Sequence, residues 1–186
     1  MSEFVSRAGF KLEHALAAFA IRVAQKTCAD LGCSTGGFVD CLLQNGATKV
    51  YAVDTGYGVL DWKLRNDPRV IVMERKNAMH VLLPEPVDIV TIDVSWTRQQ
   101  NILPAARKLL APGAMVIALI KPHYEADKSL LRKGVLPEES VDAVVDEVKQ
   151  KVEKYGFNWL QATRSPIKGT GGNTEVLALL KPLETK

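Results

Sequence analysis

The segment Thr27-Cys-Ala-Asp-Leu-Gly-Cys-Ser-Thr-Gly-Gly-Phe38 decides the fold class of this chain. It begins as a short strand, passes through a glycine-bearing turn and continues as the start of a helix. Open α/β sheets bind their ligands at this kind of strand-to-helix turn. We therefore expect a ligand-binding loop directly after the first strand of a mostly parallel sheet.

Outward from this segment, short β-branched runs alternate with longer segments of helical period, which predicts a sheet covered by helices. We expect seven strands, at Thr27–Leu31, Lys49–Asp54, Val70–Met73, Val87–Asp93, Ala114–Lys121, Asn158–Thr163 and Glu175–Leu180. Helices are expected at about residues 6–20, with Ser6 as N-cap, and at about Glu138–Tyr155. The prediction is an α/β fold with a seven-stranded, mostly parallel sheet and helices on both faces. It forms a single domain over residues 1–186, with its core at about 27–181.

Composition limits the protein class. The chain has 186 residues, 47% of them apolar, and a net charge of 24 − 21 = +3. This is ordinary for one globular domain, and the mild basicity permits a nucleic-acid partner without requiring one. The longest uncharged apolar stretch has 12 residues, short of the ~18 that a membrane span needs.

The cysteines and histidines carry no recognisable metal or disulfide pattern. The three cysteines contain no C-x-x-C pair, and the three histidines are not spaced as metal ligands. No signal peptide is evident at the N-terminus. We expect a cytoplasmic protein with no membrane span and no metal.

The glycine loop does not fit two common nucleotide-binding motifs. The dinucleotide pattern G-x-G-x-x-G fails because Ser34 stands two residues after Gly32, and no Walker lysine follows Gly37. The loop instead resembles the acidic-x-Gly-x-x-x-Gly loop of S-adenosylmethionine-dependent methyltransferases. That cofactor carries an ammonium, a carboxylate and a sulfonium but no phosphate, so its site needs carboxylates and a closely approaching backbone.

This resemblance implies a cofactor site at the ends of the first four strands. Asp30 is expected to meet the ammonium, and Gly32, Gly36 and Gly37 to let the main chain approach. Asp54 stands 54 − 32 = 22 residues after Gly32, where an acid accepts ribose hydroxyls. The expected site is completed by Cys33, Ser34, Thr35, Phe38, Asn77, Ala78 and Asp93. The plainer alternative is that the glycines only shape a tight turn and the acids cap helices.

Further motifs extend the resemblance to nearly the whole chain, from Val5 to about Lys181. They are Ser6-Arg-Ala-Gly-Phe-Lys-Leu12, Asp30-Leu-Gly-Cys-Ser-Thr-Gly-Gly-Phe38, Tyr51-Ala-Val-Asp54 with Gly56-Tyr-Gly58, and Gly172-Asn-Thr-Glu175. In order and spacing they resemble the FtsJ-like ribose 2′-O-methyltransferases, and most closely their TlyA (hemolysin A) group. The likeness implies a Rossmann-like methyltransferase fold that acts on RNA, with ribosomal RNA or a ribosomal subunit as substrate. It also implies a catalytic tetrad of Lys11, Asp93, Lys121 and Glu175.

Two differences from the TlyA group affect the expected substrate contacts. The group usually has Gln and Phe where this chain has His123 and Tyr124. It usually carries a small basic RNA-binding module ahead of this domain, and we expect the chain to lack that module. If the module belongs to the native protein, this chain should bind the cofactor well and RNA weakly; otherwise the protein reaches its RNA by other means.

The chemistry of the tetrad can be argued from the residue types. A ribose hydroxyl is a very weak acid, so a positioned base must take its proton as the methyl group arrives. Burial and a neighbouring cation both favour the neutral form of a lysine. We interpret Lys121 as the base, Lys11 as an orienting or oxyanion-stabilising group, and Asp93 and Glu175 as positioning acids. Alternatively, these residues are ordinary charges at strand ends.

Other functions remain open. A small-molecule methyltransferase would use the same cofactor site, and a membrane-active hemolysin-like protein is an alternative that no sequence feature supports. Trp62, which lies among basic residues, and Trp96, three positions after Asp93, could each stack on an RNA base. The oligomeric state is not predicted.

Overall fold

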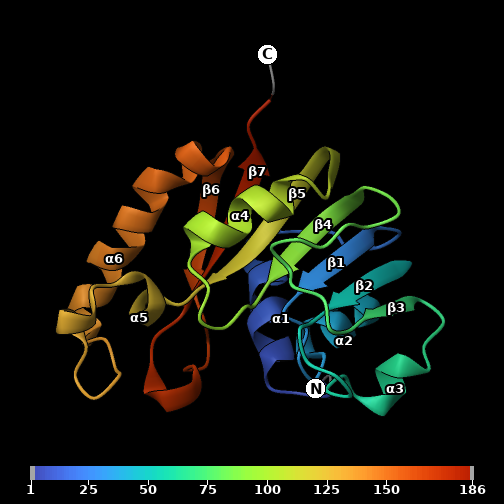
Figure 1. Cartoon of the computed structure of the whole chain (residues 1–186), viewed down its shortest axis with the longest axis horizontal. Coiled ribbons are helices and arrows are strands. Elements are labelled where there is room, and N and C mark those ends of the chain that lie inside the picture. The colour runs from blue at the N-terminus through green and yellow to red at the C-terminus, as the bar shows by residue number, and fades with distance from the viewer. Residues whose placement is uncertain (1–2, 185–186) are drawn as a thin grey trace.

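The computed structural model describes residues 3–184, so residues 1–2 and 185–186 of the predicted domain lie outside the described part. The strands are β1 (Thr27–Leu31), β2 (Lys49–Val53), β3 (Val70–Met73), β4 (Val87–Ile92), β5 (Leu110–Ile120), β6 (Phe157–Arg164) and β7 (Val176–Pro182) (Figure 1). The α-helices are α1 (Ala8–Ala18), α2 (Gly37–Gln44), α3 (Trp62–Arg65), α4 (Gln99–Arg107), α5 (Pro122–Glu125) and α6 (Glu138–Lys151). Short 3₁₀ turns are η1 (Lys128–Leu130), η2 (Val152–Tyr155) and η3 (Thr170–Gly172).

The predicted seven-stranded sheet is confirmed, and its order is β3-β2-β1-β4-β5-β7-β6. The first five strands of this order are parallel, whereas β7 runs antiparallel to both β5 and β6. Because of this reversal, Val176 at the start of β7 pairs with Ile120 at the end of β5. The residue that precedes β7 therefore reaches the same edge of the sheet as the residues that follow β1, β2, β4 and β5.

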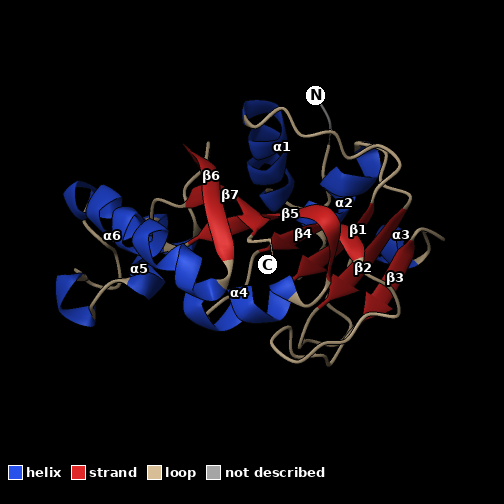
Figure 2. Ribbon diagram, turned by 90° about the horizontal axis from the view of Figure 1, so that it is seen from above, coloured by secondary structure: helices blue, strands red, loops and turns tan. Residues whose placement is uncertain are grey.

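Helices cover both faces of the sheet, as predicted (Figure 2). On one face, α1 and α2 bury apolar side chains that include Leu12, Leu16, Phe38 and Leu42. On the other face, α4 and α6 bury a second cluster that includes Ile102, Leu103 and Val148. These two apolar layers hold the sheet in place, and with it the edge at which the predicted site residues lie.

Two element starts differ from the prediction by more than one residue. Strand β5 begins at Leu110 and not at Ala114, because Leu110 pairs with Val87 across a shift in register. Helix α1 begins at Ala8, and its N-cap is Arg7 with no side-chain capping bond, so the predicted Ser6 cap is wrong. The Ser6 hydroxyl instead lies against Gly37, where an added Cβ would overlap it. The Ser6 side chain therefore lies in the contact between α1 and the start of α2, and it does not cap α1.

Candidate active site

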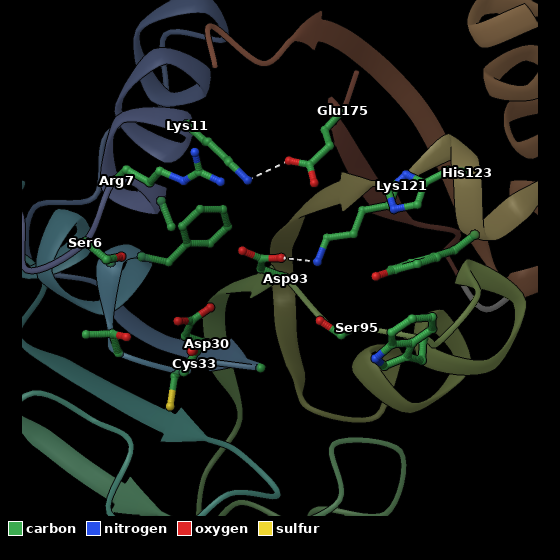
Figure 3. A pocket seen from close by; sticks show the side chains of 18 residues that line it. Ser6, Arg7, Lys11, Asp30, Cys33, Asp93, Ser95, Lys121, His123 and Glu175 are labelled. Atoms are coloured by element: carbon green, nitrogen blue, oxygen red, sulfur yellow. Dashed lines mark hydrogen bonds and ion pairs between the residues drawn. The ribbon is translucent and has the colours of Figure 1, made fainter. Parts of the chain in front are cut away.

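Two adjoining cavities lie along this edge of the sheet. The larger, of about 550 Å³, is lined by all four predicted tetrad residues and by Asp30 (Figure 3). The smaller, of about 370 Å³, is lined by Asp54, Asn77 and Ala78. Residues Gly32, Ser34 and Asp93 are common to both walls. The structure therefore joins the predicted cofactor residues and the predicted tetrad into one continuous site.

The tetrad forms two lysine–carboxylate pairs. Lys11 Nζ lies 2.5 Å from Glu175 Oε2, and both side chains are buried. Lys121 Nζ lies 2.7 Å from Asp93 Oδ1 and donates a hydrogen bond to the Val94 carbonyl oxygen at 3.2 Å. Buried charges are costly unless they are paired, so the pairing fixes where each amine can lie.

Each pair joins segments that are far apart in the sequence. Lys11 comes from α1, which packs across one face of the sheet, and Glu175 directly precedes β7. Lys121 and Asp93 follow the neighbouring parallel strands β5 and β4. The antiparallel entry of β7 is what brings Glu175 to this edge.

Asp30, at the end of β1, is a buried acid with one unsatisfied oxygen. It is 1% exposed, its Oδ1 accepts a hydrogen bond from the Thr91 hydroxyl at 2.7 Å, and its Oδ2 has no partner among the described residues. Burial raises the pKa of Asp30 to about 8, and nearby Asp93 and Asp54 add to the shift, against the Thr91 hydrogen bond. An unsatisfied buried carboxyl in the wall of a cavity fits a cationic ligand group.

The loop after β1 presents its backbone closely. Gly32 has φ +88°, and a Cβ there would lie 2.6 Å from the Asp93 carbonyl oxygen, so only glycine fits. The Asp54 carboxylate accepts hydrogen bonds from Ser34 N at 2.8 Å and from Gly56 N at 2.7 Å. Each oxygen keeps a lone pair for a ligand hydroxyl, which fits a ribose at this position.

The predicted cofactor residues fall in these walls, with one exception. The larger cavity is lined by Asp30, Gly32, Cys33, Ser34, Thr35, Gly37, Phe38 and Asp93, and the smaller by Gly32, Ser34, Asp54, Asn77, Ala78 and Asp93. Gly36 lies in neither wall. It caps α2 with φ +102°, and a Cβ there would overlap the Leu60 and Leu64 side chains. Gly36 therefore shapes the turn between β1 and α2, and its approach to a ligand stays a prediction.

Some wall residues were not identified from the sequence. Ser6 and Ala8 line the larger cavity because α1 starts beside α2, and Ser95 lines both cavities. The motif that supplied Lys11 contained Ser6 and Ala8 without marking them. Gly169 was also missed: an added Cβ at this position would overlap the Glu175 carboxylate. A glycine six residues before an acid carries no sequence signal of such contact.

Aromatic rings stand at the mouth of the larger cavity. The Trp96 side chain is exposed, and its ring lies 5.1 Å from that of Tyr124, centroid to centroid. The His123 ring lies 4.2 Å from the Tyr124 ring. Burial, and to a lesser extent the Lys121 charge, lowers the pKa of His123, which favours a neutral imidazole at pH 7. The mouth thus offers flat, mostly uncharged surfaces beside Lys121.

Within residues 3–184, no group of three or more His, Cys, Asp or Glu side chains could hold a metal ion. Over the same range, no helix has the length and apolarity needed to cross a membrane.

Known proteins with similar sequences identify the family of this chain. Residues 4–181 match the model of the family described as FtsJ-like methyltransferase. The chain is 44% identical over 185 residues to the Bacillus subtilis protein named "Putative rRNA methyltransferase YqxC", covering 94% of this chain and 64% of that protein. It is 40% identical to the Mycobacterium tuberculosis 16S/23S rRNA (cytidine-2′-O)-methyltransferase TlyA, covering 96% and 68%. The chain thus spans about two thirds of the length of these relatives.

A solved structure is also similar to this chain over its whole length. The protein described as "Putative hemolysin from Streptococcus thermophilus" is similar with a TM-score of 0.95 and 41% identity, covering 100% of this chain and 69% of that one.

Proposed function

The chain belongs to the FtsJ-like methyltransferase family, and we propose that it transfers a methyl group from S-adenosylmethionine to a ribose 2′-hydroxyl of ribosomal RNA. One observation carries this proposal: the two lysine–carboxylate pairs share a cavity with the unsatisfied carboxyl of Asp30. Such a cavity can hold a cationic cofactor next to a base. A ribosomal substrate also implies a cytoplasmic protein.

The two cavities divide the binding of the cofactor between them. Asp30 would accept the cofactor ammonium, the backbone at Gly32 would pass close to it, and Asp54 would accept the ribose hydroxyls. Asn77 and Ala78 would flank the adenine in the smaller cavity. When bound, S-adenosylmethionine supplies an electrophilic methyl carbon on a sulfonium.

The residues around Lys121 are arranged to take a proton. Asp93 and the Val94 carbonyl hold Nζ at one point in the cavity wall. To act as a base, Lys121 must be neutral when the hydroxyl arrives, and Asp93 at 2.7 Å holds the amine in position. Nζ then accepts the hydroxyl proton as the ribose oxygen attacks. Lys11, held by Glu175, supplies a positive charge near the developing oxyanion.

The cavity mouth favours a nucleic acid over a small molecule as the acceptor. Trp96 is 85% exposed, and its φ of +61° is rare for an aromatic residue. An unstacked base can lie on this ring or on the neighbouring Tyr124 ring.

We expect Trp96→Ala to raise the KM for RNA about fivefold or more, since base–aromatic stacking contributes about 1–3 kcal/mol. The affinity for S-adenosylmethionine should stay unchanged, as isothermal titration can check. An unchanged KM for RNA would remove Trp96 from the substrate site.

Gly169 gives a separate prediction about Glu175. A methyl group at Gly169 would displace the Glu175 carboxylate from Lys11 and break this buried pair. Gly169→Ala should therefore lower kcat at least tenfold, because misplacing a catalytic group by 1 Å can cost about 100-fold in rate. The Tm should also fall, since a buried lysine is left without its partner.

The control for this variant is Gly172→Ala in the same loop. Gly172 has φ +86° and open space around its missing Cβ. Backbone strain should lower the Tm of this control but leave kcat near that of the unmodified chain. Equal kcat losses in both variants would contradict the role given to Gly169.

The proposed function is tested by offering different acceptors. Labelled S-adenosylmethionine is incubated with the protein and either ribosomal subunits, purified rRNA or free ribonucleosides. We expect label in a ribosomal acceptor and none in free ribonucleosides. Label in ribonucleosides alone would support the small-molecule alternative and contradict the proposal.

A further inference from the structure

Two further exposed aromatic side chains lie in the segment that follows β2, outside both cavities. Tyr57 and Trp62 are 71% and 76% exposed, and neither lines the two cavities. They stand 62 − 57 = 5 residues apart, on the loop after β2 and at the start of α3. Figure 1 shows α3 near the β3 edge of the sheet, at the end of the molecule opposite α6. The mechanism described above uses neither ring.

A cation accompanies the Tyr57 ring. The guanidinium carbon of Arg75 lies 4.3 Å from the centroid of the Tyr57 ring, a cation–π contact. In residues 3–184, no carboxylate lies within ion-pair distance of Arg75 or of its neighbour Lys76. Arg75 also has φ +54°, and its N–H donates to the Gly56 carbonyl at 3.1 Å, so the β3 end is bound to the Tyr57 loop. The Arg75 guanidinium therefore lies against the Tyr57 ring with no ion-pair partner in residues 3–184.

The loop beneath the rings is held rigidly. Glu74 accepts hydrogen bonds from Gly58 N at 2.8 Å and from the Arg65 guanidinium. The N–H of Asp61 donates to the Thr35 carbonyl at 3.0 Å, which joins α3 to the cofactor loop. A surface with so little freedom loses little entropy when a ligand binds. Two large exposed rings on such a support mark a binding surface.

We propose that Tyr57, Trp62 and Arg75 form a docking site for single-stranded RNA, outside the catalytic cavity. This inference rests on the proposed function, since the bound strand would be a stretch of the substrate RNA near the target ribose. Bases stack on the exposed faces of Tyr57 and Trp62, while Arg75 meets a phosphate. A duplex would not bind in this way, because its bases are already stacked on one another. The uncompensated cations favour a polyanion over an apolar protein partner.

Tryptophan fluorescence tests the site directly. The chain has three tryptophans, so W96F together with W159F leaves Trp62 as the sole reporter. A single-stranded oligoadenylate of about ten nucleotides should quench this fluorescence and bind at least tenfold more tightly than an RNA duplex of equal length. In the same background, Tyr57→Ala should weaken binding at least fivefold, the lower end of one lost stacking contact. Arg75→Gln should weaken it and lower the slope of log K against log salt by about one.

Leu82→Ala serves as the matched control, because Leu82 is 81% exposed and lies outside both cavities. It should leave both the affinity and the salt slope unchanged. Equal binding of duplex and single strand, or unaltered affinity in Tyr57→Ala, would overturn the inference. So would quenching by a non-nucleic polyanion such as heparin with equal affinity.

The inference and the proposed function can fail separately. If the chain methylates a ribose in rRNA with the same KM in Tyr57→Ala as in the unmodified chain, the docking site is wrong and the activity stands. If oligoadenylate binds Trp62 as expected but no ribose is methylated, the docking site stands and the activity is wrong. Binding of S-adenosylmethionine by Tyr57→Ala should equal that of the unmodified chain in either case.

Discussion

Replacing Asp30 with Asn should make the cofactor-free protein more stable and its cofactor affinity much lower. The Asp30 carboxyl is buried with an unsatisfied oxygen, which an uncharged amide tolerates better than a carboxylate does. Thr91 can still donate to the amide oxygen. The same change removes the negative charge that a cofactor ammonium needs. Gains in stability from loss of a binding group are expected at sites built for a ligand.

The pH dependence of stability has a definite sign. The pKa of Asp30 is about 8 in the folded protein against 3.8 for an ordinary aspartate. Between these two values the folded state holds a proton that the unfolded state has lost, so the free energy of unfolding falls as pH rises from about 4 to 8. Asp30→Asn lacks this dependence. The stability gained by the variant should therefore be larger at pH 8 than at pH 5.

The expected gain in stability of Asp30→Asn is the difference between two opposing effects. Ionisation of the unfolded carboxyl favours unfolding by roughly 4 kcal/mol at pH 7, and an unpaired amide N–H₂ offsets about 1–3 kcal/mol of the gain. The net stabilisation should raise the Tm at pH 7 by roughly 3 °C or more. The cofactor Kd at pH 8 should rise about 30-fold or more, as for a lost partner of a buried charge pair.

Differential scanning calorimetry and isothermal titration check both halves of this prediction. In the unmodified protein, the affinity for S-adenosylmethionine should fall by up to tenfold per pH unit below pH 8, because binding must expel the Asp30 proton. Asp146→Asn, at an exposed position of α6, is the control and should change neither quantity. A destabilised Asp30→Asn, or one that keeps its cofactor affinity, would show that Asp30 is a structural acid.

Replacing Lys121 with Ala should lower kcat by about 100- to 10,000-fold, the range for a lost general base. The cofactor Kd should remain within about threefold of the original value, because the proposed cofactor contacts are made by Asp30, Gly32 and Asp54. Single-turnover methyl transfer with saturating RNA measures the chemical step. Circular dichroism confirms folding, since the variant leaves Asp93 without its lysine partner.

Lys121→Arg distinguishes a base from a charge. An arginine keeps the positive charge beside Asp93 but cannot be deprotonated at accessible pH. If Lys121 is the base, Arg should be as inactive as Ala. Substantial activity in Lys121→Arg would mean that the positive charge and not proton transfer is required at this position.

Much of the fold follows from local pattern, because parallel strands read as short β-branched runs between helices. The strand ends that carry Asp30, Asp54, Asp93 and Lys121 were predicted to within a residue for the same reason. The early start of β5 was not predicted, since Pro112 and Gly113 resemble a loop and only pairing with β4 extends the strand through them.

The sequence predicts which residues belong to the candidate site, but not how these residues contact one another. The family resemblance predicts that Lys11 and Glu175 belong to the site. Their spacing in the sequence does not show that they form a pair, because the two residues are 164 positions apart and only the packing of α1 beside β7 brings them together. Gly36 and Gly169 illustrate the same limit of sequence-based prediction. The sequence shows that a glycine is present, but it does not reveal whether the space left by the missing side chain is filled by a ligand, by leucines or by a catalytic carboxylate.

The position of the methyl group on the RNA tests the central claim most directly. A 2′-O-methyl group removes the hydroxyl that attacks the neighbouring phosphate in alkali, so the bond that follows it resists cleavage. rRNA is incubated with labelled S-adenosylmethionine and either the unmodified chain or Lys121→Ala, then hydrolysed in alkali and separated by mass. We expect label in an alkali-resistant dinucleotide with the unmodified chain and none with Lys121→Ala. Label recovered in mononucleotides would place the methyl on a base and contradict ribose 2′-O-methylation.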